Sequence, residues 1–217
     1  IPLAIEGKDL IGIAQTGTGK TLAFAIPSLQ RLAQGKGKCL VLLPTRELAL
    51  QVDETFQKIA PVFGIKTAVI IGGASMGLQV QALKKNPKVI IATPGRLVDH
   101  MERCTIMLAD TNVLVLDEAD RMLDMGFMPS IERILKAIPR EKQTLLFSAT
   151  IPPEIMQIAT KYMKLPISVE VAPSGTTAEK VVQELYIVRK ESKRKLLEKI
   201  LGQYHGSVLL FTRTKIG

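Results

Sequence analysis

The chain of 217 residues has no tryptophan, three tyrosines and six phenylalanines. Proteins that hold single-stranded nucleic acid by stacking its bases need several exposed aromatic rings, so this composition argues against a base-stacking platform. Cysteine is scarcer still. Cys39 lies in an apolar run, Cys104 follows a segment of helical character, and their spacing matches no metal site. The sequence therefore predicts two reduced, structural thiols.

Long apolar runs are also missing. Segments such as Leu40–Leu43 and Val113–Leu116 are far shorter than the ~18 residues that a membrane-spanning helix needs. The chain does not open with the basic and then apolar pattern of a signal peptide. We therefore expect an intracellular protein, cytoplasmic or, in a eukaryote, nuclear.

What the chain does have is apolar content and positive charge. Hydrophobic residues make up 47% and charged residues 23% of the sequence, which is typical of globular proteins. Lys and Arg total 29 against 20 Asp and Glu, so the formal net charge is +9. This balance suits a polyanionic partner such as nucleic acid, although many basic proteins bind nucleic acid only nonspecifically.

Short apolar runs alternate with helix-sized segments along most of the chain. The expected strands are Asp9–Ile13, Leu40–Leu43, Ala68–Ile71, Val89–Ala92, Val113–Leu116, Thr144–Phe147 and Ile167–Val171. The expected helices include Leu22–Ile26, Leu48–Ala60, Leu78–Lys85, Leu97–Arg103, Pro129–Ala137 and Pro153–Tyr162. The strands are continuously apolar, as in sheets whose two faces are both covered. The pattern predicts an α/β domain with a doubly wound parallel sheet.

Turn-forming residues near position 173 indicate a domain boundary. We expect a first domain over residues 1–172, a linker over 173–180, and the start of a second domain over 181–217. In the last part, Val181–Val188 and Ser207–Phe211 read as strands around a helix over Ser192–Tyr204. About forty residues cannot close a second α/β sheet, and the chain has no initiating Met, so we expect a fragment.

A phosphate-binding loop is predicted between the first strand and the first long helix. Its residues are Ala14, Gln15, Thr16, Gly17, Thr18, Gly19, Lys20 and Thr21. Small residues let successive backbone N–H groups face an anion, Lys20 would reach the β- and γ-phosphates, and the Thr21 hydroxyl would bind Mg²⁺. The generic pattern has Gly where this chain has Ala14. A purely geometric strand-to-helix turn is the alternative interpretation.

Acidic residues follow the predicted strand Val113–Leu116, where ligands bind in open α/β sheets. Asp117 would hold Mg²⁺, and Glu118 would position or polarise the water that attacks the γ-phosphate. The alternative is an acidic helix N-terminus, which the helix dipole favours.

The order of these and further motifs resembles the DEAD-box family of ATP-dependent RNA helicases over nearly the whole chain. The motifs are Ala14–Thr21, Pro44–Ala49, Gly72-Gly73 with Gln79, Thr93–Arg96, Asp117–Asp120, Ser148–Thr150 and Leu210–Thr214. The family itself carries Ala at the first position of the phosphate loop. The resemblance implies a RecA-like P-loop NTPase domain, followed by a truncated second RecA-like domain, with ATP and Mg²⁺ as cofactors.

The resemblance also implies RNA-binding residues in three loops, each of which follows a predicted strand. They are Pro44, Thr45, Arg46, Gly72, Gly73, Gln79, Thr93, Pro94, Gly95 and Arg96. Gly allows close backbone approach and Arg makes forked contacts to phosphate, whereas nothing here reads base edges, so the binding is expected to be largely independent of sequence. Ordinary strand-to-helix turns are the alternative for each loop taken alone.

Coupling between nucleotide and RNA is implied for Ser148 and Thr150, with Asp120 as their expected partner. Thr150 is equally suited to capping a helix. His100 and His205 have no catalytic spacing, so we expect them at surface or cap positions.

The expected function is therefore that of an RNA-dependent ATPase and RNA helicase that acts as a monomer. An ATP-gated RNA clamp with slow hydrolysis is the alternative, and an ATPase acting on DNA or protein is a third reading. The family's adenine-recognising segment precedes the part that matches Ile1–Ala4, and its γ-phosphate arginines follow the part that matches Gly217. We therefore expect the isolated chain to be nearly inactive, and its choice of ATP rests on the resemblance.

Overall fold

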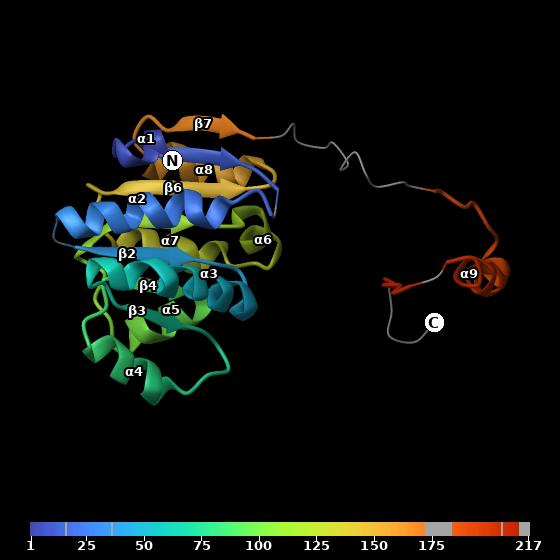
Figure 1. Cartoon of the computed structure of the whole chain (residues 1–217), viewed down its shortest axis with the longest axis horizontal. Helices are drawn as coiled ribbons and strands as arrows, with labels where there is room; N and C mark the ends of the chain where they lie inside the picture. Colours follow the sequence, from blue (N-terminus) through green and yellow to red (C-terminus); the bar gives the residue numbers. More distant parts are fainter. Residues whose placement is uncertain (16, 36, 172–183, 205, 213–217) are drawn as a thin grey trace. The chain divides into compact units, whose positions relative to one another are not determined.

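Seven apolar segments pair in one parallel sheet within the described residues, in the order β3-β4-β2-β5-β6-β1-β7 (Figure 1). The strands are β1 (Leu10–Ile13), β2 (Lys38–Leu42), β3 (Thr67–Ile70), β4 (Val89–Ala92), β5 (Thr111–Leu116), β6 (Gln143–Ser148) and β7 (Ile167–Glu170). This computed structural model describes residues 1–15, 17–35, 37–171, 184–204 and 206–212. The expected seven strands and the doubly wound parallel sheet are confirmed.

Helices cover both faces of the sheet. They are α1 (Pro2–Ile5), α2 (Lys20–Gln34), α3 (Arg46–Ile59), α4 (Met76–Lys84), α5 (Pro94–Glu102), α6 (Ala119–Asp124), α7 (Met128–Ala137) and α8 (Pro153–Tyr162), with a 3₁₀ turn η1 (Ala60–Phe63). Successive strand residues point to opposite faces, so Cys39 and Val41 pack with α1, α2 and α3, while Leu40 and Leu42 pack with α5, α6, α7 and α8. None of the helices in the described residues is long and apolar enough to cross a membrane.

The outermost strands depart from the expectation of full burial. Every residue of the central strands β4 and β6 is buried, whereas β3 alternates buried and half-buried residues and most of β7 is exposed. A strand at the rim of a sheet has one neighbour and less helix cover. Its sequence therefore needs fewer apolar residues.

The chain divides into two compact units, Ile1–Thr176 and Thr177–Gly217. The second contains a 3₁₀ turn η2 (Lys190–Ser192) and α9 (Lys193–Leu201), so the expected helix is present. The expected strands are wrong where they can be judged, because residues 184–188 and 207–211 form no strand. Isolated strands are unstable without a partner ladder, and no described segment of this unit supplies one. Residues 173–183, which include the expected linker, lie outside the described residues.

Because every strand of the sheet runs in the same direction, all loops that leave a strand lie at one edge, the carboxyl edge. Along this edge the three loops expected to bind RNA follow the neighbouring strands β3, β4 and β2. The acidic motif follows β5, the segment Ser148–Thr150 follows β6, and the phosphate loop follows β1. The topology thus places all the predicted site residues of this unit on one edge.

Candidate functional site

The phosphate loop turns from β1 into α2 through Gly19, which caps the helix with a φ of 84°. Side chains with a Cβ rarely adopt this left-handed conformation, so glycine fits the position. The Thr18 hydroxyl donates a hydrogen bond to the Gln15 carbonyl (2.8 Å) and closes the turn. The positive end of a helix of 15 residues therefore faces the space above the loop.

Ala14 is the point at which the loop departs from the generic phosphate-loop pattern. It is buried, and its amide donates to the Ser148 carbonyl at the end of β6 (3.0 Å). A methyl group is therefore accommodated here, and the loop is tied to the segment expected to couple nucleotide and RNA. Thr16, another predicted ATP contact, lies outside the described residues.

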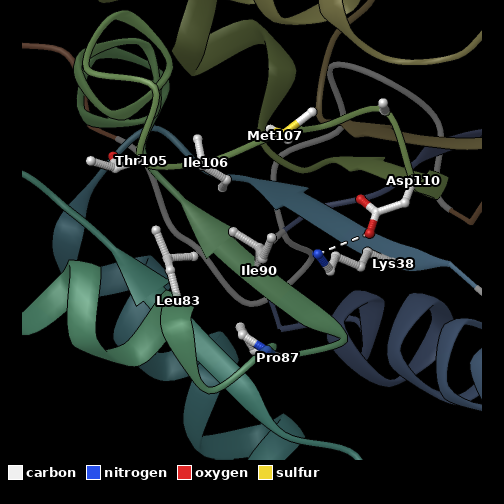
Figure 2. A pocket seen from close by; sticks show the side chains of 9 residues that line it. Lys38, Leu83, Pro87, Ile90, Thr105, Ile106, Met107 and Asp110 are labelled. Carbon is white, nitrogen blue, oxygen red and sulfur yellow. Dashed lines mark ion pairs between the residues drawn. The ribbon is translucent and has the colours of Figure 1, made fainter.

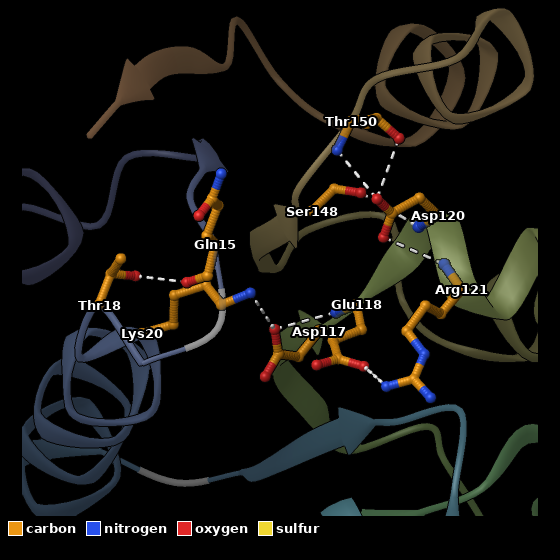
Figure 3. A network of polar contacts seen from close by, with 9 residues as sticks. All are labelled: Gln15, Thr18, Lys20, Asp117, Glu118, Asp120, Arg121, Ser148 and Thr150. Atoms are coloured by element: carbon orange, nitrogen blue, oxygen red, sulfur yellow. Dashed lines mark hydrogen bonds and ion pairs between the residues drawn. The ribbon is translucent and has the colours of Figure 1, made fainter. Parts of the chain in front are cut away.

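Lys20 and Asp117 meet at the centre of the edge, with Nζ 3.9 Å from Oδ1 (Figure 3). Asp117 is fixed by its own amide, which donates to the Leu42 carbonyl, and by the Glu118 amide, which donates to Oδ1. Burial raises the pKa of Asp117 from 3.8 to about 6, although Lys20 lowers it in part. The positive charge of Lys20 therefore compensates the buried Asp117 carboxylate only in part.

Glu118 is held in a strained backbone conformation beside Asp117. Its φ is 52° and its ψ 51°, in the left-handed region that non-glycine residues seldom occupy, at a cost on the order of 1–3 kcal/mol. The side chain is nearly buried, and Oε2 accepts a hydrogen bond and ion pair from Arg121 Nη1 (2.7 Å). Arg121 was not among the residues predicted from the sequence. The available signal was an Arg three residues after a Glu, the spacing at which such side chains commonly pair near a helix start.

Asp120 joins the acidic motif to the end of β6. Its amide donates to Ser148 Oγ (3.1 Å), and its Oδ2 accepts from both the amide (2.9 Å) and the hydroxyl (3.0 Å) of Thr150 (Figure 3). Burial alone raises the pKa of Asp120, but hydrogen bonds from Thr150 and Ser148 outweigh it and lower the pKa below its ordinary value. The pairing expected from the sequence is present, and Thr150 is not a helix cap, because α8 begins after Pro152.

The donor groups at this site suit Mg²⁺ in particular. Asp117 and the half-buried Thr21 are the candidate protein ligands, and the described residues contain no cluster of three His, Cys, Asp or Glu side chains able to hold a metal ion. Mg²⁺ is commonly bound by one or two protein groups, with phosphate oxygens and water completing its shell. The residues present therefore fit a magnesium ion that arrives with a nucleotide.

The three loops expected to bind RNA contact one another. The Arg96 guanidinium donates from Nη1 to the Ala74 carbonyl (3.3 Å), and a Cβ placed on Gly73, whose φ is 71°, would overlap the Arg46 guanidinium. Thr45 caps α3 by accepting from the Leu48 amide. The exposed members are Arg46 and Gly73, with Thr45, Gly72, Gly95 and Arg96 half-buried and Pro44, Thr93 and Pro94 buried.

Two sequence expectations are corrected behind these loops. Gln79, expected to touch RNA, is buried and donates from Nε2 to the Ile71 carbonyl (2.9 Å), so it supports the loop from inside. His100, expected at a surface or cap position, has an exposed fraction of 0% and contacts Gln79. His205 lies outside the described residues. Burial of a polar side chain depends on tertiary packing, which residue spacing does not reveal.

An apolar hollow of about 360 Å³ lies beside the phosphate loop. Leu3, Ala23, Phe147 and Val169 line it together with the loop residues Thr18 and Lys20. A second hollow, of about 460 Å³, lies at the amino ends of β2, β4 and β5, the opposite edge of the sheet (Figure 2). There Lys38 and Asp110 form an ion pair of 2.9 Å. Only the first hollow adjoins the predicted site.

Comparison with known proteins agrees with this geometry. The family model described as DEAD/DEAH box helicase matches residues 1–158. The chain is 46% identical to an ATP-dependent rRNA helicase RRP3 of Yarrowia lipolytica and 43% identical to the ATP-dependent RNA helicase CshA of Listeria monocytogenes. Each alignment covers 99% of this chain, but 46% and 42% of those proteins, so the chain spans less than half of their length.

Solved structures give the same result. A DEAD box protein from Methanococcus jannaschii matches with a TM-score of 0.75 and 36% identity, over 92% of this chain and 54% of that one. The yeast DEAD-box splicing factor Prp28 matches with a TM-score of 0.75 and 34% identity, over 91% of this chain and 49% of that one. The expected RecA-like fold is confirmed, and the chain belongs to the DEAD/DEAH box helicase family, as a DEAD-box member.

Proposed function

We propose that this chain supplies the nucleotide-binding and RNA-binding core of an ATP-dependent RNA helicase. The observation that carries the proposal is the convergence of Lys20 on Asp117 at 3.9 Å, below the positive end of α2. That arrangement suits the phosphates of a nucleotide and a divalent cation. The names of the two curated relatives, an rRNA helicase and an RNA helicase, support the same activity.

In the nucleotide site, the backbone of Ala14–Thr21 would cradle the phosphates and Lys20 would neutralise the β- and γ-phosphates. Thr21 and Asp117 would hold Mg²⁺, which supplies charge neutralisation on the phosphate oxygens. Glu118 would orient the attacking water. The apolar hollow beside the loop suits the flat face of a nucleobase.

On the other half of the edge, RNA would lie along the loops after β2, β3 and β4. Arg46 and Arg96 supply charge for phosphate oxygens, and the Gly72-Gly73 backbone allows close approach. None of these groups suits base-edge recognition, so the binding is proposed to be largely independent of sequence. Asp120, Ser148 and Thr150 link the acidic motif after β5 to the end of β6, and they would transmit the nucleotide state to the RNA loops.

The test is magnesium-dependent ATP turnover with and without single-stranded RNA, measured on the longest natural form of the protein, since this chain alone is expected to be nearly inactive. We expect RNA to stimulate turnover, and Glu118→Gln to reduce it by about 10²–10⁴-fold while nucleotide still binds. Glu102→Gln is the matched control, because Glu102 is an exposed carboxylate that also pairs with an arginine, Arg133. Turnover that ignores RNA, or that survives Glu118→Gln, would contradict the proposal.

The ion pair between Glu118 and Arg121 favours a second candidate, an ATP-gated RNA clamp. A carboxylate engaged by a guanidinium at 2.7 Å is not free to orient water, which would make hydrolysis slow and RNA retention long. The two functions differ in how strand-displacement rate compares with the lifetime of bound RNA. For a clamp, Arg121→Gln should accelerate turnover and shorten RNA retention. For a helicase, the rate of strand displacement in the unsubstituted protein should match its rate of ATP turnover.

A further inference from the structure

The short loop that carries Gly72 and Gly73 is held at both ends by hydrogen bonds from side chains, one of them buried and the other part-buried. At its start, the Ile71 carbonyl accepts from Gln79 Nε2 (2.9 Å). At its end, the Ala74 carbonyl accepts from Arg96 Nη1 (3.3 Å). The conformation of the two glycines between these anchors is therefore set by side chains behind the loop.

Helix α5 supplies a side chain to each of these two attachments. Arg96 and His100 are four residues apart, so they lie on the same face of this helix, one turn from each other. Arg96 reaches the Ala74 carbonyl directly, whereas His100 reaches Ile71 through Gln79, with Nε2 3.1 Å from Gln79 Oε1. One helix thus fixes the two sides of a loop that belongs to another part of the sequence.

The hydrogen-bond pattern defines which atoms carry protons. A carbonyl oxygen only accepts, so the NH₂ group of Gln79 must face Ile71 and its Oε1 must face His100. His100 Nε2 therefore carries the proton. On the other side of the ring, Nδ1 lies 2.8 Å from the Thr105 hydroxyl, which fixes the ring plane. Burial and the nearby Arg96 guanidinium, against an opposing effect of Asp99, keep the pKa of His100 below its usual value.

We propose that His100 is a positioning residue for RNA binding: it orients Gln79, and through Gln79 it holds the Gly72-Gly73 loop where Arg46, Arg96 and the loop backbone face one RNA strand. The proposal rests on the proposed RNA-binding function of this edge. His100 touches no ligand itself, because its exposed fraction is 0%.

An apolar side chain would fill the same space without doing this. It would leave Oε1 of the buried Gln79 without a donor, and the amide would gain by rotating away from Ile71. A glutamine at position 100 can instead place an NH₂ group near the site of the imidazole Nε2–H. The two replacements therefore separate positioning from packing.

The experiment compares His100→Leu with His100→Gln. We expect His100→Leu to weaken binding of a single-stranded oligonucleotide RNA about tenfold in fluorescence anisotropy, because a buried hydrogen bond of this kind contributes on that order. Affinity for a fluorescent ATP analogue should stay within about twofold of the parent, since the nucleotide half is not touched. His100→Gln should restore most of the RNA affinity.

Two further variants distinguish a loss of RNA positioning from a general loss of fold stability. Gln143→Leu removes a buried amide that donates to the Ala4 and Lys8 carbonyls, far along the sheet from the RNA loops. It should lower the melting temperature and leave RNA affinity unchanged. Thr105→Val is a milder change at a half-buried residue that lines the hollow of Figure 2. It releases the His100 ring and should reproduce the His100→Leu pattern at smaller amplitude.

Amide hydrogen exchange of residues 70–76, measured without RNA, distinguishes the possible failures. We expect faster exchange in His100→Leu and parental exchange in His100→Gln. If the parent protein binds no RNA, the proposed function fails, while unchanged exchange in His100→Leu overturns the role of His100. Equal losses of RNA and nucleotide affinity in His100→Leu and Gln143→Leu would also overturn it.

Discussion

At the residue scale, Asp117 carries a carboxylate whose ionised form is unfavourable because the side chain is buried. Its carboxylate is nearly buried, and Lys20 is too distant at 3.9 Å for a good hydrogen bond. The Glu118 amide donates a hydrogen bond of 2.9 Å to its Oδ1. A group in this position gains when a cation arrives, and it destabilises the fold when none is present.

The stability consequence has a definite sign with pH. The pKa of Asp117 is raised from 3.8 to about 6 in the folded protein, so folding takes up a proton between these values. The ionised group therefore destabilises the native state above about pH 6, and this penalty disappears below about pH 4. We predict that Asp117→Asn stabilises the ligand-free protein at pH 8 by up to about 3 kcal/mol, and not at pH 4.

Urea denaturation of both proteins at the two pH values measures this difference. Asp124→Asn, at an exposed position of α6, is the matched control and should change little at either pH. An equal gain for Asp117→Asn at both pH values would show that the carboxylate is not the source of the effect.

Gly73 offers a second prediction at the same scale. Its φ of 71° is costly for any residue with a Cβ, and a Cβ there would also displace Arg46. Gly64 has a φ of 64° with no atom near its Cβ position, so Gly64→Ala isolates the backbone cost. We predict that both alanines destabilise the fold by about 1 kcal/mol, and that only Gly73→Ala also weakens RNA binding. Thermal unfolding and RNA anisotropy measure the two effects, and equal RNA affinities in the two variants would contradict the role of Arg46.

At the scale of elements, β6 lies within the nucleotide half of the edge and carries the groups that join its two motifs. The strand lies between β5, which leads to the acidic motif, and β1, which leads to the phosphate loop. Ser148 at its end accepts from the Asp120 amide with its side chain and from the Ala14 amide with its carbonyl. A shift of the phosphate loop is thus felt by the acidic motif through one residue.

Thr150→Val tests this connection, because it removes the hydroxyl donor to Asp120 and leaves the backbone N–H. We predict that the pKa of Asp120 rises and that strand displacement per ATP hydrolysed falls several-fold, while ATP turnover changes less. The measurement is the ratio of the two rates in the longest natural form of the protein. Thr160→Val is the control, since its exposed hydroxyl donates to the Met156 carbonyl within α8. A parental ratio in Thr150→Val would rule out coupling through this hydroxyl.

The elements also mark the limit of sequence-based prediction. The central strands were predictable because burial on both faces makes them continuously apolar, and Lys20 and Asp117 were predictable neighbours because both follow parallel strands. Helix α6 has six residues and no long apolar stripe, so the sequence indicated it only through the alternative interpretation of the acidic motif as a helix N-terminus. The Gln79–His100 contact joins α4 to α5, and no residue pattern within either helix predicts it.

At the scale of the whole molecule, the net charge of +9 does not arise at the nucleotide site. There Asp117, Glu118 and Asp120 outnumber their partners Lys20 and Arg121. If the chain binds RNA as proposed, the RNA would be held by positive charge elsewhere, and the exposed Arg46 beside Gly73 is the best-placed candidate. Phosphate contacts release bound counterions, so each one adds to the salt dependence of binding.

We predict that the affinity for single-stranded RNA falls steeply as salt is raised, and that Arg46→Gln lowers the slope of log K against log salt by about 0.7. Arg133→Gln, which removes an exposed arginine of α7 paired with Glu102, should leave the slope unchanged. Anisotropy titrations at several salt concentrations measure all three slopes. The comparison is decisive because both variants lower the net charge by one. If the slopes fall equally, RNA is attracted by the charge of the whole molecule, whereas a loss confined to Arg46→Gln assigns a phosphate contact to the carboxyl edge of the sheet.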